Sequence, residues 1–285
     1  MRTIDITAKD GAAIPAVVFN ADSDTFKGVV IVSYGFGEHH EMYTELALCL
    51  GQGGYAVILY DLRGHGAPPD DRKNWFGVIK SYQSFLDDLA SVTEAARQMA
   101  PGMPIVLYGH SMGGNIVLNL LLRSSSEYAC AVLESPWLGL SLKLSPLLLG
   151  MAKLMGAISA NATTVNKLVV SDLSSDPARA EGYTTDPLYH NRISFRMFNG
   201  IINGCAFALE NAAKLPVPVF MAYAKNERIV SNEAALRFAA KAGEKVTVME
   251  YESCHAIHND VKLEELFRDV IAFLDEHCAA YPGSG

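Results

Sequence analysis

The sequence has few features of an exported, membrane-spanning or nucleic-acid-binding protein. Residues 1–7 contain no apolar run of signal-peptide length, and no run in the 285 residues reaches the length of a transmembrane helix. The most apolar stretch, 144–158, is interrupted by Ser145, Pro146 and Lys153. Acidic residues outnumber basic ones, 31 to 23, for a net charge of −8. This charge argues against nucleic acid or an anionic membrane surface as a partner.

The cysteines and histidines are too scattered for a disulfide framework or a common metal site. The five cysteines are odd in number and spread from Cys49 to Cys278, which predicts reduced thiols and a cytoplasmic location. The sequence has no His-Glu-x-x-His motif and no other clustered ligand spacing. We therefore expect neither a metal nor a cofactor. His39, His40 and His110 are interpreted as loop and turn residues.

Residues 104–118 organise the rest of the chain. An apolar run of strand length leads into Gly109-His110-Ser111-Met112-Gly113, after which a helical pattern begins. Gly-x-Ser-x-Gly between a strand and a helix is typical of the nucleophile elbow, in which a tight turn lifts the serine above the sheet edge. The pattern predicts Ser111 as a catalytic nucleophile. The alternative is a structural turn between strand and helix.

Short apolar segments alternate with helical patterns along most of the chain, which predicts an α/β fold with a mostly parallel sheet. Two segments near the start, around Lys9-Asp10-Gly11, are typical of a hairpin. The continuous apolar runs are typical of strands buried on both faces. The eight predicted strands are 3–7, 15–20, 28–33, 55–60, 104–108, 129–133, 216–223 and 245–251.

Residues 137–215 break this alternation and predict an inserted helical cap, or lid, above the nucleophile. The predicted organisation is a core of 1–136 and 216–281, the cap between its two parts, and a disordered tail of 282–285. The cap is rich in Leu and Met, which would suit an apolar acyl channel. Ordinary helix packing is the alternative for any one of these side chains.

A serine nucleophile needs a base and an acid, and two candidates exist for each. His255 is the first histidine after the last predicted strand, and His258 competes with it. Glu227 follows the strand 216–223 and is placed to orient the imidazole, unless it is a surface carboxylate paired with Arg228. Glu134, at the end of the strand 129–133, is a second carboxylate within possible reach of the histidine.

The oxyanion formed in acyl transfer needs two backbone donors. The amide of Met112 follows the nucleophile at the start of a helix, and Phe36 lies between Gly35 and Gly37 in the loop after the strand 28–33. We predict these two amides as the oxyanion hole. A plain glycine turn is the alternative reading of the Phe36 loop.

Six short motifs follow one another over nearly the whole chain: Tyr-Gly-Phe-Gly-Glu-His (34–39), Asp-Leu-Arg-Gly-His-Gly (61–66), Gly-His-Ser-Met-Gly-Gly (109–114), Asp-Pro-Leu (186–188), Ala-Lys-Asn-Glu-Arg-Ile-Val (224–230) and His-Ala-Ile-His-Asn-Asp (255–260). In this order they resemble the motifs of the monoacylglycerol lipase and lysophospholipase group of the α/β-hydrolase superfamily.

The resemblance implies an α/β-hydrolase fold with Ser111 as nucleophile and His255 as base. It also implies Phe36 and Met112 as oxyanion donors, and Asp61 and Arg63 as structural braces. Three residues depart from the group. Tyr34 replaces a histidine, Glu227 stands where the group has aspartate, and Glu134 stands where a small residue is commoner.

These features predict a serine carboxylester hydrolase that cleaves monoacyl esters, such as monoacylglycerols or lysophospholipids, through an acyl-enzyme. The expected partner is a small ester with an apolar acyl group, without nucleic acid and without stable membrane insertion. Three alternatives remain open: an esterase for short-chain or aromatic (cinnamoyl-type) esters, an acyltransferase, and a catalytically silent ligand-binding protein.

Overall fold

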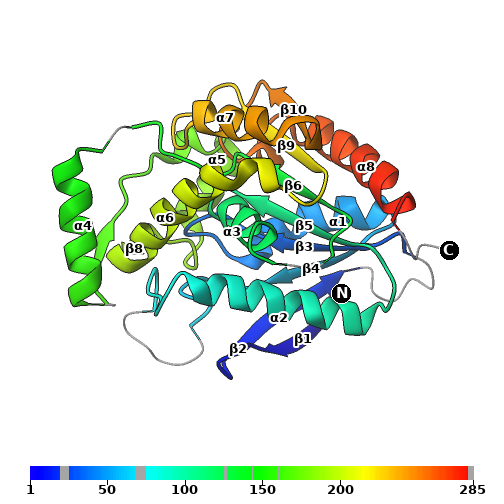
Figure 1. Ribbon diagram of the computed structural model, residues 1–285, viewed down its shortest axis with the longest axis horizontal. Helices are drawn as coiled ribbons and strands as arrows, with labels where there is room; N and C mark the ends of the chain where they lie inside the picture. The colour runs from blue at the N-terminus through cyan, green and yellow to red at the C-terminus, as the bar shows by residue number, and fades with distance from the viewer. Residues whose placement is uncertain (20–25, 69–74, 125–126, 143, 160, 282–285) are drawn as a thin grey trace.

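An eight-stranded sheet runs through the centre of the computed structural model, which describes residues 1–19, 26–68, 75–124, 127–142, 144–159 and 161–281 (Figure 1). The predicted tail, 282–285, lies outside these residues. The strand order is β1-β2-β4-β3-β5-β6-β9-β10. The strands are β1 (Arg2–Thr7), β2 (Ala13–Phe19), β3 (Val29–Ser33), β4 (Ala56–Tyr60), β5 (Ile105–His110), β6 (Cys130–Glu134), β9 (Val219–Ala224) and β10 (Val246–Tyr251).

The sheet is parallel from β4 to β10, and the β1–β2 hairpin continues it in antiparallel pairing. Every residue of β3, β4, β5 and β6 is buried, as expected for apolar strands covered on both faces. The predicted α/β-hydrolase fold with a mostly parallel eight-stranded sheet is confirmed.

The register of the central strands positions the site. Ser33 pairs with Gly109 across β3 and β5, and His110 pairs with Glu134 across β5 and β6. Glu134 also pairs with Ala222 of β9. The loops that follow these four strands therefore leave the sheet side by side at its carboxyl edge.

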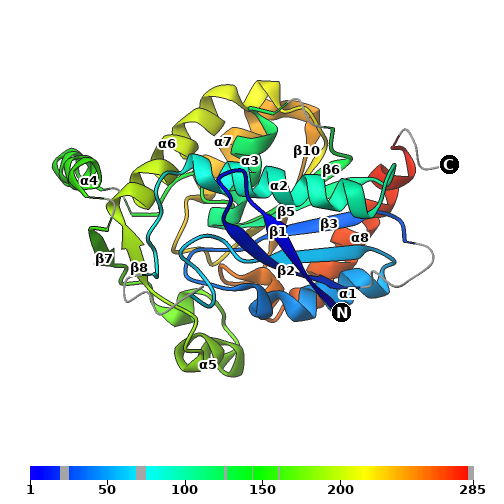
Figure 2. The same cartoon turned by 90° about the horizontal axis from the view of Figure 1, so that it is seen from below.

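Helices cover both faces of the sheet. Figure 2 shows α2, α3 and α7 on one side, and α1 and α8 on the other. Their apolar faces supply most of the helical part of the core, for example Phe85, Leu89 and Val92 of α2. The helices are α1 (Thr44–Gln52), α2 (Gln83–Met99), α3 (Met112–Leu121), α7 (Asn232–Ala242) and α8 (Leu263–Ala279).

The chain between β6 and β9 forms separate elements beside the sheet. They are α4 (Pro146–Ile158), β7 (Thr163–Val165), α5 (Pro177–Thr185), β8 (Arg192–Ser194) and α6 (Phe195–Asn211). Strands β7 and β8 form a small antiparallel sheet that sequence analysis did not predict, because three residues are too few to show a periodic pattern.

Helix α4 lies at the edge of the molecule and packs on α6 (Figure 1). Ser145 caps its first turn by accepting a hydrogen bond from the Leu148 amide at 3.3 Å. Ala152 and Gly156 are its buried residues, whereas most of its Leu and Met side chains are exposed. Within the described chain, no helix combines the length and the hydropathy needed to cross a bilayer.

Candidate active site

Ser111 lies in a strained turn between β5 and α3. Its backbone angles are φ 51° and ψ −113°, and residues other than glycine rarely adopt such a positive φ. Two hydrogen bonds hold the turn: the Ser111 amide donates to the Glu134 carbonyl, and the Trp137 amide donates to the Ser111 carbonyl, both at 2.9 Å. Such strain persists only where surrounding contacts enforce it, and it is commonly found at functional residues.

The glycines of the elbow allow the backbone of α3 to press against the end of β3. A Cβ atom on Gly113 would lie 1.8 Å from the carbonyl oxygen of Ser33 and 2.7 Å from that of Tyr34. A Cβ on Gly109 would lie 2.7 Å from the Cα of Gly114. Only glycine fits at these points, which brings the start of α3 against the loop that follows β3.

Glu227 and His255 form a buried hydrogen-bonded pair. Oε2 of Glu227 lies 2.7 Å from Nδ1 of His255, and both side chains are almost inaccessible to solvent. Oε1 of Glu227 accepts from the amides of Ile229 and Val230. Burial alone would raise the pKa of Glu227, but the His255 imidazole and these two amides lower it below its usual value. Arg228 is not paired with Glu227 in the described structure; its Nη1 lies 3.4 Å from Oδ1 of Asp172.

Glu227 occupies Nδ1 of His255, and within the described chain Nε2 of His255 makes no hydrogen bond. The ring of His255 lies 4.9 Å from that of His110, the residue before Ser111. Within the described chain, no hydrogen bond joins His255 to the Ser111 hydroxyl. Catalytic hydrogen bonds often form fully only when substrate is bound. Burial alone would lower the pKa of His255, but the nearby Glu227 carboxylate has the larger effect and raises this pKa above its usual value.

Glu134 pairs with the other histidine of this loop. Its carboxylate oxygens lie 2.9 and 3.0 Å from Nδ1 of His258, and the His258 amide donates to it at 2.9 Å. Burial would raise the pKa of Glu134, but the imidazoles of His258 and His110 lower it to about 2. The structure thus places the two sequence candidates for the acid in two separate Glu–His pairs.

Phe36 lies in the loop that follows β3, and Met112 is the first residue of α3, whose Gly113 packs against the start of that loop. Neither the Phe36 amide nor the Met112 amide donates a hydrogen bond within the described chain. The β3 loop is held by Glu38, which accepts from the Gly35 amide at 2.7 Å. Phe36 itself is largely buried. Two backbone donors near the nucleophile match what an oxyanion hole requires.

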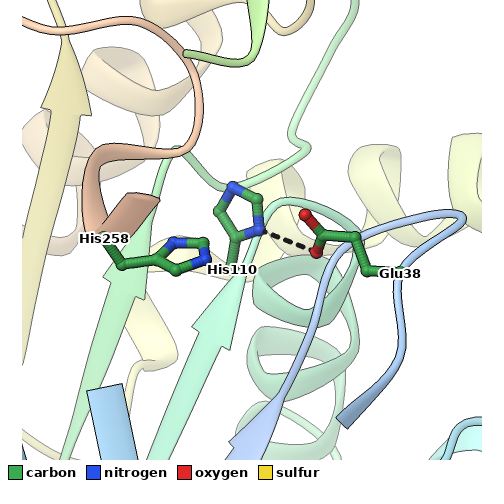
Figure 3. Close-up of side chains that lie close together, drawn as sticks. All are labelled: Glu38, His110 and His258. Carbon is green, nitrogen blue, oxygen red and sulfur yellow. Dashed lines mark hydrogen bonds and ion pairs between the residues drawn. The ribbon is translucent and has the colours of Figure 1, made fainter. Parts of the chain in front are cut away.

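Glu38, His110 and His258 form a buried cluster behind the elbow (Figure 3). The Tyr43 hydroxyl donates to Oε2 of Glu38 at 2.6 Å and lies 2.7 Å from Nδ1 of His110, which is 3.3 Å from the same oxygen. Burial would raise the pKa of Glu38, but the imidazoles of His110 and His258 lower it to about 2. Sequence analysis missed this cluster, although Glu38 and His110 both lie inside motifs that it examined.

One potential ligand atom from each of these three side chains lies within 4.8 Å of the others, a spacing that a metal ion could bridge. However, Oε2 of Glu38 already accepts from the Gly35 amide and the Tyr43 hydroxyl. A metal at this oxygen would displace bonds that hold the β3 loop. The cluster therefore fits a hydrogen-bonded network better than a metal site.

Asp61, Arg63 and Tyr34 brace neighbouring loops. The Tyr34 hydroxyl accepts from the Leu62 amide at 2.6 Å and donates to Asp61 at 3.1 Å. Arg63 binds the buried carboxylate of Asp88 through two nitrogens. Tyr34 is 1% exposed, so its ring supports the loop around Asp61 from the protein interior.

The segment between β6 and β9 contacts two of the loops around Ser111. Its His190 amide donates to the Gly37 carbonyl at 2.9 Å, and its ring lies 5.6 Å from that of Phe36. The amide of His255 donates to the carbonyl of Asp172 in the same segment at 3.2 Å. The segment is therefore built into the walls of the site.

Comparison with known proteins identifies the family. The sequence profile of the family described as serine aminopeptidase, S33, matches residues 24–262. The chain belongs to this family. The relatives described next match the chain over most of its length and are named as lipases and a phospholipase.

Three relatives illustrate the similarity. A monoacylglycerol lipase of Mycolicibacterium smegmatis is 27% identical over 94% of both chains. A Bacillus subtilis phospholipase, YtpA, is 26% identical over 87% of this chain and 95% of its own length. The crystal structure of a Paleococcus ferrophilus monoacylglycerol lipase superposes with a TM-score of 0.81 at 25% identity, over 97% of this chain and all of that one. The predicted resemblance to the monoacylglycerol lipase group and the prediction of a serine hydrolase are confirmed.

Proposed function

We propose that this chain hydrolyses carboxylic esters that carry a single acyl chain, through an acyl-enzyme on Ser111. The observation that carries the proposal is the strained Ser111 turn beside a histidine whose Nδ1 is fixed by Glu227 at 2.7 Å. A nucleophile, a base and an orienting acid in this arrangement define serine acyl transfer.

In this mechanism Nε2 of His255 takes the proton of the Ser111 hydroxyl as its oxygen attacks the ester carbonyl. Glu227 holds the proton of Nδ1 and stabilises the imidazolium that forms. The amides of Phe36 and Met112 donate to the oxyanion. His255 then protonates the leaving alcohol, and the acyl-enzyme forms. A water molecule, activated by the same histidine, releases the acid and restores Ser111.

The substrate class is supported by the relatives, which are named as lipases of monoacylglycerol and as a phospholipase. It also agrees with the apolar character of α4, where Leu147, Met151, Leu154 and Ile158 are all more than half exposed. We propose that residues 137–215 act as a cap whose apolar side chains meet the acyl chain. A cytoplasmic location remains part of the proposal, and the five free thiols support it.

The test is a kinetic panel of p-nitrophenyl esters from acetyl to palmitoyl, run beside monoacylglycerol, lysophospholipid and cinnamoyl esters, with Ser111→Ala as the control. We expect turnover of medium- or long-chain monoacyl esters and none by the variant. A preference for acetyl or cinnamoyl esters would overturn the substrate class. Full activity of Ser111→Ala would overturn the mechanism.

A further inference from the structure

We propose that Glu134 is a positioning residue that ties the nucleophile turn to the loop carrying the catalytic histidine. The inference rests on the proposed function, because it assigns His255 as the base. Glu134 is the last residue of β6 and is fully buried. It contacts both the turn that carries Ser111 and the loop that carries His255. A small residue at this position would keep the backbone bond to Ser111 but could not make the side-chain bonds to His258.

The side chain of Glu134 holds the histidine loop. Both of its oxygens lie within 3.0 Å of Nδ1 of His258, and Oε1 also accepts from the His258 amide at 2.9 Å. The Tyr108 hydroxyl donates to Oε2. His258 follows His255 by three residues, so a carboxylate bound to its backbone fixes the end of the segment that presents the base.

The backbone of Glu134 holds the nucleophile. Its carbonyl accepts from the Ser111 amide at 2.9 Å. The next residue, Ser135, shares with Ser111 a positive φ, here 42°, and its amide donates to Ala222 of β9. These are the two non-glycine residues with positive φ among those described. The strained end of β6 is thus hydrogen-bonded both to the elbow and to the neighbouring strand.

The His258 ring continues this connection back to the elbow. It stacks on Tyr43, with ring centroids 4.4 Å apart, and lies edge-on to His110 at 4.9 Å. The Tyr43 hydroxyl lies 2.7 Å from Nδ1 of His110. Because His110 precedes Ser111, a shift of the His258 ring would be transmitted to both members of the reacting pair.

The other end of the histidine loop has a separate anchor. Asp260 accepts from the Cys254 amide and the Ser253 hydroxyl, each at 2.7 Å. These two bonds join the start of the loop, just after β10, to its end, so without Glu134 the loop would still be closed by this anchor. We therefore expect loss of Glu134 to displace His255 rather than to detach the loop.

The experiment compares Glu134→Ala, Glu134→Gln and His258→Asn with wild type on the best ester, each about 20 °C below its own midpoint of thermal unfolding. Glu134→Ala removes the side-chain connection, and we expect kcat to fall by about 10- to 100-fold with KM within about two-fold. Glu134→Gln keeps an acceptor for the His258 amide but removes the carboxylate charge, and His258→Asn keeps that amide but removes the imidazole; for each we expect kcat to fall by about 3- to 10-fold.

Asp88→Asn is the matched control, because Asp88 is equally buried and ion-paired, with Arg63. It should lower the midpoint of thermal unfolding and leave kcat unchanged. Wild-type kcat in all soluble Glu134 and His258 variants would overturn the inference, even if those variants were less stable. If Glu134→Ala is insoluble, Glu134→Gln and His258→Asn decide the matter alone. Activity retained by Ser111→Ala would instead overturn the proposed function.

Discussion

Nδ1 of His258 lies 2.9 Å from Oε1 of Glu134, in an arrangement that repeats, three residues further along the same loop, the 2.7 Å contact between His255 and Glu227. The two pairs are buried alike, but their positions differ. His258 is bound to Glu134 and stacked on the ring of Tyr43, whereas in the described chain His255 is bound to Glu227 and its ring contacts one other ring, that of His110. This difference separates a supporting pair from a reacting one.

The first prediction concerns the identity of the acid. Glu227→Gln should lower kcat by about 10³- to 10⁴-fold, because an amide can no longer fix the productive tautomer of His255 or stabilise its charged form. Glu134→Gln should lose no more than about 10-fold. Glu45→Gln, at an exposed carboxylate bound to Arg179, serves as the surface control and should be fully active. A larger loss in Glu134→Gln than in Glu227→Gln would reverse the two assignments.

The second prediction concerns the pH dependence of kcat/KM. Glu227 raises the pKa of His255 above its usual value of 6.5, and the base works only when it is deprotonated. Activity should therefore fall, on the acidic side, with a midpoint above pH 6.5. In Glu227→Gln the stabilising charge is lost, so the residual activity should have its midpoint at lower pH. An unchanged midpoint in that variant would argue against the pair.

The third prediction concerns the elbow glycine. Gly113→Ala would place a methyl group 1.8 Å from the Ser33 carbonyl oxygen, and rigid backbone on both sides cannot yield. We expect a loss of at least about 4 kcal/mol in the free energy of unfolding, or no soluble protein. Gly150→Ala, on α4 with open space around it, should instead stabilise the chain by about 1 kcal/mol. Denaturant titration measures both, and a stable Gly113→Ala variant would contradict the packing described.

The fourth prediction concerns stability in acid. The pKa values of Glu38 and Glu134 are lowered from 4.5 to about 2 in the folded chain, so each contributes stability that is complete above pH 4.5. That contribution is lost as the pH falls from 4.5 toward 2. The free energy of unfolding, measured by denaturant titration at each pH, should decline over this interval. The slope should be shallower in Glu134→Gln than in wild type.

The sheet and the elbow were predictable from sequence because their signals are local. Apolar runs of five or six residues mark buried strands, and the glycines around Ser111 mark a turn that other residues cannot make. Motif order then singled out His255, Phe36 and Met112, whose catalytic roles stay predictions.

The prediction of Glu227 as the acid, with Glu134 as the alternative, rested on the motif resemblance as well as on position, because Glu134 ends β6 and Glu227 follows β9 at the same edge of the sheet. Which histidine each carboxylate binds depends on the path of the loop between β10 and α8. No periodic pattern in the sequence predicts that path. The cluster around Glu38 was missed for a similar reason. Tyr43 and His110 are 67 residues apart in sequence, and they meet because β3 pairs with β5, so that the chain leaving β3 returns beside the end of β5.

The most direct test of the central claim is to treat the protein with a fluorophosphonate and locate the adduct by mass spectrometry of peptides. The account predicts one covalent adduct, on Ser111, with ester turnover lost in proportion to labelling. It also predicts no labelling of Ser111→Ala and slow labelling of Glu227→Gln. An adduct on another residue, or full ester turnover by protein labelled at Ser111, would contradict the assignment of Ser111 as the nucleophile.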